Sequence, residues 1–170
     1  LTTLIIYSLF IISDTYAQWS IDPASPQSLG SGIQAQVAAT SDGGVYIAWL
    51  TDGNYHVYIQ RLDAAGEAQI GAINMLVSDN NNSSWIAVYH LNLTVDGDDN
   101  AIITTVDERT GIWEVYAWKI APDGSMLWGE DGVVVTAFGA SNMSPRLTVL
   151  PDNSVVVTCT HNNNTVLFQR

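Results

Sequence analysis

The side chains best suited to chemistry in this chain are its carboxylates. Aspartate and glutamate number 17 against five lysines and arginines, which gives a formal net charge of -12. Two adjacent pairs, Asp107-Glu108 and Glu130-Asp131, supply the residue types that a glycosidase uses as general acid and as base or nucleophile. The sequence does not fix the distance between these pairs, and acidic residues are common in turns. A glycosidase-type extracellular hydrolase is therefore an alternative hypothesis.

A second acidic segment, Asp96-Gly-Asp-Asp-Asn100, places oxygen donors at alternate positions, as calcium-binding loops do. Asp96, Asp98 and Asn100 are its candidate metal ligands. The glycine that an EF-hand loop requires is missing, and the related loops at 41–44 and 151–153 lack most of the donors. A plain hairpin turn is favoured, and a calcium-stabilised adhesin is a third hypothesis. We expect no cofactor.

The histidines do not form a recognisable catalytic or metal-binding pattern. His56, His90 and His161 stand alone, without the spacing that builds a zinc site. The sequence also lacks the Gly-x-Ser-x-Gly elbow of serine hydrolases and a phosphate-binding glycine loop. We expect the three histidines to be surface or packing residues.

Six tryptophans suggest a surface that could stack on sugar rings. Trp49, Trp118 and Trp128 lie in segments expected to be strands, where aromatic side chains fill the space between sheets. Trp85 and Trp113 lie closer to expected loops. These two are the candidate ligand-binding residues, and the first three are predicted to pack in the core.

The elements that would position these residues are visible as an internal repeat. Residues 54–66 (NYHVYIQRLDAAG) align with residues 112–124 (IWEVYAWKIAPDG), and 166–170 (VLFQR) align with 115–119 (VYAWK). The segment 45–50 likewise aligns with 101–106 and 154–159. Repeats of this size indicate supersecondary units stacked on their neighbours.

Each unit is about 55 residues long and holds four runs rich in valine, isoleucine, tyrosine, tryptophan and threonine. The runs have the length and the two-residue alternation of β-strands. Turn-forming sequences separate them, as at 41–44, 64–66, 122–124 and 151–153. No amphipathic helix is predicted after residue 17.

Four strands per unit, repeated in tandem, favour an all-β fold of β-propeller blades in an incomplete ring, with a β-sandwich as the alternative. Gln18-Trp19 matches Leu127-Trp128, which opens the last strand of a unit, and so predicts a closing outer strand. We expect the chain to be an N-terminal fragment whose remaining blades lie elsewhere in the full-length protein. The expected divisions are a signal peptide (1–17), a closing strand and linker (18–34), blade 1 (35–90), blade 2 (91–144) and a partial blade 3 (145–170).

The segment 58–66, preceded by a strand that follows Gly43-Gly44 and ends in Trp49, resembles blades of large exported propeller proteins from gliding and related bacteria. Proteins of that type often end in a type IX secretion sorting domain, and many begin with a strand like Gln18-Trp19-Ser20. The resemblance covers residues 18–170 and implies an exported propeller. Residues 121–128 are similar, more loosely, to the Asp-box hairpins of sialidases and to quinone-binding propeller blades, but neither likeness implies an activity.

Composition favours an extracellular location. Residues 4–12 are an apolar run shorter than a membrane span, and Thr15 and Ala17 suit signal-peptide cleavage. The single cysteine, Cys159, excludes an intrachain disulfide framework and is expected to be buried. The negative charge argues against nucleic acid, and no membrane span is predicted in the mature chain. We expect a non-enzymatic scaffold or recognition module at the cell surface or outside the cell, with an extracellular protein or polysaccharide as partner.

Overall fold

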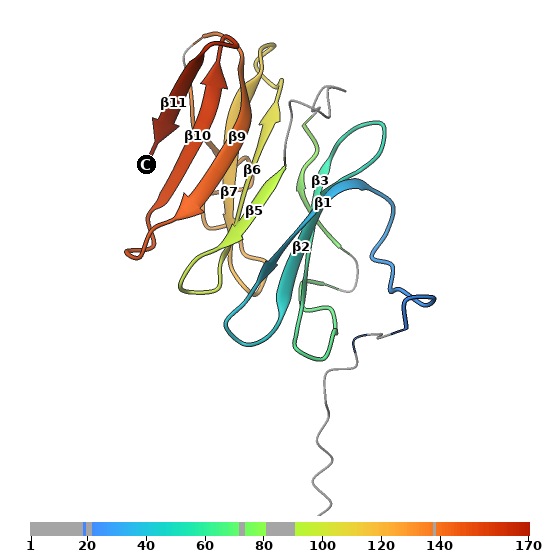
Figure 1. The fold of residues 1–170 in the computed structure, drawn as a ribbon. Coiled ribbons are helices and arrows are strands. Elements are labelled where there is room, and N and C mark those ends of the chain that lie inside the picture. The colour runs from blue at the N-terminus through green and yellow to red at the C-terminus, as the bar shows by residue number, and fades with distance from the viewer. Residues whose placement is uncertain (1–18, 20–21, 72–73, 81–90, 138) are drawn as a thin grey trace, which may run out of the picture.

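A computed structural model describes residues 19, 22–71, 74–80, 91–137 and 139–170, and Figure 1 shows their arrangement. These residues form β-strands and no helix, as the sequence predicted. Consequently the described part of the chain offers no helical segment of the length and apolarity that crossing a membrane requires. The strands are β1 (Ile33–Ala39), β2 (Val45–Leu50), β3 (Val57–Leu62), β4 (Met75–Ser78), β5 (Asn92–Val95), β6 (Ala101–Asp107), β7 (Glu114–Ile120), β8 (Val133–Val134), β9 (Asn142–Val149), β10 (Val155–His161) and β11 (Thr165–Gln169).

The strands form three antiparallel sheets, each of which follows the chain from one strand to its neighbour. The first sheet has the order β1-β2-β3-β4, the second β5-β6-β7-β8 and the third β9-β10-β11. Short hairpins are sufficient for this topology because each strand pairs with the strand that precedes it.

The third strands of the three sheets, which align in sequence, take the same register against the second strands. Tyr58 lies opposite Trp49, Tyr116 opposite Thr105, and the aligned Leu167 opposite Cys159. Cys159 thus takes the place of Trp49 and Thr105, so the predicted alignment of 154–159 with 45–50 and 101–106 is one residue out, and the structural equivalents are 155–160. A shift of one residue would move every side chain to the other face of the sheet, so the common register gives corresponding residues corresponding surroundings.

Hairpins of one kind join the first two strands of each sheet. In each, the N–H of the first turn residue donates to the carbonyl of the fifth: Thr40 to Gly44 (3.0 Å), Asp96 to Asn100 (3.0 Å) and Leu150 to Ser154 (2.8 Å). The fourth residue has a positive φ, at Gly43, Asp99 and Asn153. Glycine, aspartate and asparagine tolerate that conformation, which explains the residue types of the predicted turns.

The second sheet lies between the other two, so both of its faces are covered (Figure 1). Every residue of β6 is buried. One core cluster fills the space between the first and second sheets and includes Tyr46, Ile59, Ile103 and Trp118. A second cluster, of Val106, Val115, Val157 and Cys159, lies between the second and third sheets.

Candidate functional site

Two buried carboxylates face each other at the end of the β6–β7 hairpin. Asp107 and Glu114 are directly opposite in the antiparallel pair, and they are 1% and 7% exposed. Like charges at opposing positions destabilise a sheet, and an unpaired buried carboxylate costs several kcal/mol. Their burial therefore requires partners within the same region.

Arg109 neutralises Asp107. Its Nε donates to Asp107 Oδ1 at 3.0 Å, and its Nη2 lies 2.6 Å from Oδ2. The guanidinium carbon is 3.7 Å from the centre of the Tyr116 ring, within the range of a cation–π contact. Nη1 donates to the backbone carbonyl of Asp131 at 2.8 Å. The structure thus brings together the segments that carry the two predicted carboxylate pairs, but Asp131 contributes its main chain.

Glu114 is held by hydroxyl groups. Its Oε2 accepts a hydrogen bond from Thr110 Oγ1 at 2.7 Å and from the Tyr116 hydroxyl at 3.1 Å. Burial, followed by the hydrogen bond to Glu114, raises the pKa of Tyr116 to about 12. The phenol therefore remains a hydrogen-bond donor at neutral pH.

Glu108 and Trp113 contact each other at the same hairpin end. The indole Nε1 of Trp113 donates to Glu108 Oε1. The Trp113 ring is half-buried and packs against the second core cluster, and its backbone carbonyl accepts the N–H of Asn142 at 2.7 Å. Trp113 thus lies at the joint between the second and third sheets. The other candidate, Trp85, falls outside the described residues.

The polar groups of this hairpin end satisfy one another. Both oxygens of the Asp107 carboxylate contact Arg109, so Asp107 serves as the counter-ion of that guanidinium. Over the described ranges, no three histidine, cysteine, aspartate or glutamate side chains are grouped so as to hold a metal ion. The arrangement clamps the hairpin to the segment before β8.

The segment 96–100, which carries the candidate calcium ligands, forms a hairpin turn, which is the structure that the sequence favoured. Asp96 Oδ1 accepts the N–H groups of Asp98 and Asn100, both at 2.9 Å, and Oδ2 lies 2.7 Å from Lys119 Nζ. Burial favours a higher pKa for Asp96, but the hydrogen bonds from Lys119 and Asn100 outweigh it and hold the pKa below its usual value. Both carboxylate oxygens therefore already have partners within the protein.

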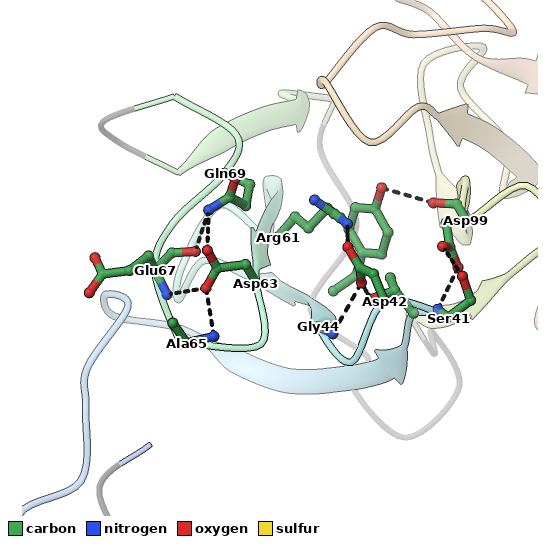
Figure 2. A network of polar contacts seen from close by, with 11 residues as sticks. Ser41, Asp42, Gly44, Arg61, Asp63, Ala65, Glu67, Gln69 and Asp99 are labelled. Carbon is green, nitrogen blue, oxygen red and sulfur yellow. Dashed lines mark hydrogen bonds and ion pairs between the residues drawn. The ribbon is translucent and has the colours of Figure 1, made fainter. Parts of the chain in front are cut away.

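Asp99, in the same turn, links the first and second sheets, as Figure 2 shows. The Asp99 carboxylate accepts the Ser41 N–H at 2.7 Å and the Ser41 hydroxyl at 2.6 Å. The Tyr46 hydroxyl donates to the Asp99 carbonyl at 3.0 Å. Asp99 thus connects the first turn of the second sheet with the first turn of the first sheet.

The next pair of sheets is joined in the same way. Asn153 Oδ1 accepts the Gly97 N–H at 2.9 Å, and Asn153 Nδ2 donates to Asp98 Oδ2 at 3.1 Å. A Cβ atom at Gly97 would lie 2.7 Å from Asn153 Oδ1, so the glycine leaves room for this contact. We call the two contacts, Ser41–Asp99 and Gly97–Asn153, the turn clasps. Asp98, a candidate calcium ligand, is part of the second clasp.

Within the first sheet, further carboxylates close their own turns. Arg61 forms an ion pair with Asp42, whose carboxylate also accepts the Gly44 N–H at 3.1 Å (Figure 2). Asp63 Oδ1 accepts the N–H groups of Ala65 and Glu67, both at 2.9 Å. These acidic residues stabilise hairpins, as expected for aspartate in turns.

The remaining candidate residues are dispersed. Trp49 and Trp118 are buried, as predicted, and Trp128 is half-buried. Cys159 is buried as predicted, and burial raises the pKa of its thiol. His56 Nδ1 lies 3.2 Å from Asn54 Nδ2, and His161 Nδ1 lies 3.0 Å from Asn142 Oδ1, on different sheets. His90 falls outside the described residues.

An open groove lies between β4 with the residues after it and the segment that connects β7 to β8. Its volume is about 680 Å³, and it is lined by residues 75–80 on one side and by residues 124–126 and 129–131 on the other. Met75 and Met126 form apolar parts of its wall, and Asp79, Glu130 and Asp131 are acidic residues along it. We call it the first groove. Sequence reasoning missed it because its two sides are far apart along the chain.

Comparisons with known proteins give one distant likeness. No family model and no curated protein matches the chain. Among solved structures, the crystal structure of alpha-L-arabinofuranosidase from Lactobacillus brevis aligns with a TM-score of 0.43 and 13% sequence identity. The alignment covers 87% of this chain and 58% of that chain, so this chain spans less than two thirds of its length. A likeness of this strength supports no assignment of fold or activity.

Proposed function

We propose that this chain is a section of an exported, non-enzymatic β-propeller that serves as a scaffold or recognition module at the cell surface or outside the cell. The observation that carries the proposal is that three buried carboxylates have partners within the protein. Asp96 and Asp107 are each paired with a cation, and Glu114 accepts two hydroxyl hydrogen bonds. These side chains stabilise hairpins, so the first groove remains as the surface for binding.

The propeller arrangement is supported by apolar side chains that are exposed on the third sheet. Val166 and Phe168 of β11 are 77% and 76% exposed. The residues at corresponding positions of β3, Val57 and Ile59, are buried against the second sheet. Apolar residues at these positions favour a further sheet packed on the third, as in a ring of blades.

The first groove is the proposed recognition surface. Its mixture of methionine and carboxylate side chains suits a ligand with apolar faces and hydroxyl or cationic groups, such as a polysaccharide or a protein segment. The net charge of -12 disfavours anionic ligands by long-range repulsion.

A binding screen against extracellular polysaccharides and proteins, run with a matched pair of variants, tests the proposal. Glu130→Lys reverses a charge in the first groove, whereas Glu67→Lys makes the same change at an exposed turn residue outside it. We expect E130K to weaken binding of a hit and E67K to leave it unchanged.

The purified protein and further variants also distinguish this proposal from its two alternatives, a glycosidase-type hydrolase and a calcium-stabilised adhesin. Turnover of chromogenic glycosides that is abolished by Glu130→Gln or Asp107→Asn would replace the scaffold with a glycosidase. Binding that requires calcium, and that is lost in Asp98→Asn, would favour the adhesin. Equal binding by E130K and E67K would refute the assignment of the groove.

A further inference from the structure

Sulfur atoms are the most easily oxidised groups of this protein. The whole sequence contains three methionines, Met75, Met126 and Met143, and one cysteine, Cys159. Met143 and Cys159 are 3% and 4% exposed, so solutes reach them poorly. Burial also raises the pKa of the Cys159 thiol, which keeps it in the protonated, less nucleophilic form. The two remaining sulfur atoms, by contrast, belong to side chains that line the first groove.

Met75 and Met126 approach the first groove from different sheets. Met75 of β4 lies directly opposite Ile59 of β3, and Met126 forms an isolated antiparallel bridge with Ile120 at the end of β7. Directly opposed residues of antiparallel strands share one face of the sheet. Ile59 and Ile120 both belong to the core cluster between the first and second sheets. Each methionine therefore points from its own sheet into the space between the two.

Both methionine side chains combine packing with access to solvent. They pack against the buried residues of that core cluster, and each is partly exposed along the groove. The Met75 sulfur also lies 3.6 Å from the position that a Cβ atom would take at Gly124, in the turn that follows β7. A change in the polarity of these thioethers therefore acts on the contact between the first two sheets.

We propose that Met75 and Met126 form a paired oxidation site, at which hydrogen peroxide converts both thioethers to sulfoxides and thereby loosens the packing of the first sheet on the second. In each reaction the sulfur attacks one peroxide oxygen, and the O–O bond breaks as the S–O bond forms. The proton of the transferred hydroxyl passes to the departing oxygen, which leaves as water. The sulfur loses two electrons and the peroxide gains them, so the reaction requires no further co-reactant.

Oxidation changes the packing because a sulfoxide is polar, whereas the thioether is apolar and only a weak hydrogen-bond acceptor. The side chains directly opposite, Ile59 and Ile120, are hydrocarbon and cannot donate to the new oxygen. To remain hydrogen-bonded, the oxygen has to turn towards water, and the side chain then gives up contacts with the core cluster. An effect of oxidation on ligand binding rests on the recognition role proposed for the first groove, but the modification and the loss of stability do not.

The test treats the whole chain with hydrogen peroxide and follows the oxidation of each methionine by peptide mass spectrometry. Met143 is the internal control, because it has the same chemistry but is buried in β9. The chain unfolded in urea gives the rates without protection by the fold. Stability is measured as the melting temperature before and after oxidation, for wild type, for the double variant Met75→Leu with Met126→Leu, and for Met143→Leu as its matched control. Leucine is close to methionine in volume and cannot form a sulfoxide.

In the folded protein we expect Met75 and Met126 to be oxidised at least about tenfold faster than Met143, and in urea we expect similar rates for all three. Oxidation should lower the melting temperature by about 2–6 °C in wild type and in M143L, and by less than about 1 °C in the double variant. Equal rates for the three methionines in the folded protein would overturn the proposal. So would an unchanged melting temperature of oxidised wild type, or a double variant that loses as much stability as wild type. No ligand is used, so the result is independent of the binding screen for the first groove.

Discussion

Replacing Arg109 with alanine isolates the cost of leaving a buried carboxylate without its cation. Asp107 is 1% exposed and receives the Arg109 Nε and Nη2 groups at 3.0 and 2.6 Å. After the substitution it would keep the hydrogen bond from the backbone N–H of residue 109, at 3.1 Å. The cation above Tyr116 and the donor to the Asp131 carbonyl would also be lost.

The expected destabilisation follows from these contacts. Removing one partner of a buried ion pair costs about 3–5 kcal/mol, because the remaining charge stays buried and uncompensated. The Arg109 side chain is itself 19% exposed, so water can reach the place that it vacates, and the lower end of that range, about 3 kcal/mol, is the better estimate. For a chain of this size, a loss of about 3 kcal/mol lowers the melting temperature by about 6–12 °C.

Differential scanning calorimetry of R109A beside Arg146→Ala provides the test. Arg146 is exposed, and its side chain donates to the adjacent Pro145 carbonyl, so R146A removes the same charge with an expected change below about 0.5 kcal/mol. Changing both partners, as in Asp107→Asn with Arg109→Met, should recover part of the loss because no buried charge remains. An R109A protein that melts within about 1 °C of wild type would refute the reasoning.

Three further outcomes are expected. Asp99→Gly removes the first turn clasp and keeps the positive φ that Gly43 adopts at the same turn position, so unfolding should become easier by about 1 kcal/mol in urea titrations; an unchanged midpoint would show that the clasp is energetically silent. Because the pKa of Asp96 is lowered from 3.8, its ionised form stabilises the fold above about pH 4, and this contribution is lost as the pH falls through the lower, folded value. Melting curves of Asp96→Asn should therefore vary less with pH in the acid range than those of wild type, and parallel curves would contradict the assignment. Adding a chelator should leave the melting temperature unchanged, since the Asp96 oxygens already have protein partners; a fall of several degrees would favour the calcium hypothesis.

Strand positions could be predicted from the sequence because the signals are local. The run 45–50 is β2 with the same bounds, and the run 101–106 is β6 with one more residue, Asp107. Turn residues at 41–44 and 151–153 determine hairpins because glycine and asparagine adopt the positive φ and the aspartate side chains accept backbone N–H groups within the turn.

The pairing of side chains in the candidate site could not be predicted, although most of its contacts join residues of one hairpin. Asp107 and Glu108 looked like one half of a catalytic pair, yet each has a different partner, Arg109 or Trp113. The equivalent cations Arg61 and Lys119 bind different aspartates, Asp42 and Asp96, although they align in sequence. Which carboxylate a cation reaches depends on turn shape and on the sheet packed beside it, and neither is encoded in a short motif.

By itself, the sequence determined that the chain is built of short antiparallel strands with Asp- and Gly-containing reversals, since alternation and turn chemistry act over a few residues. The tertiary structure alone decided how the sheets meet. The turn clasps, the burial of both faces of the second sheet and the first groove all arise where segments of different sheets come together. Their physical origin is the packing of one sheet on the next, which no local pattern specifies.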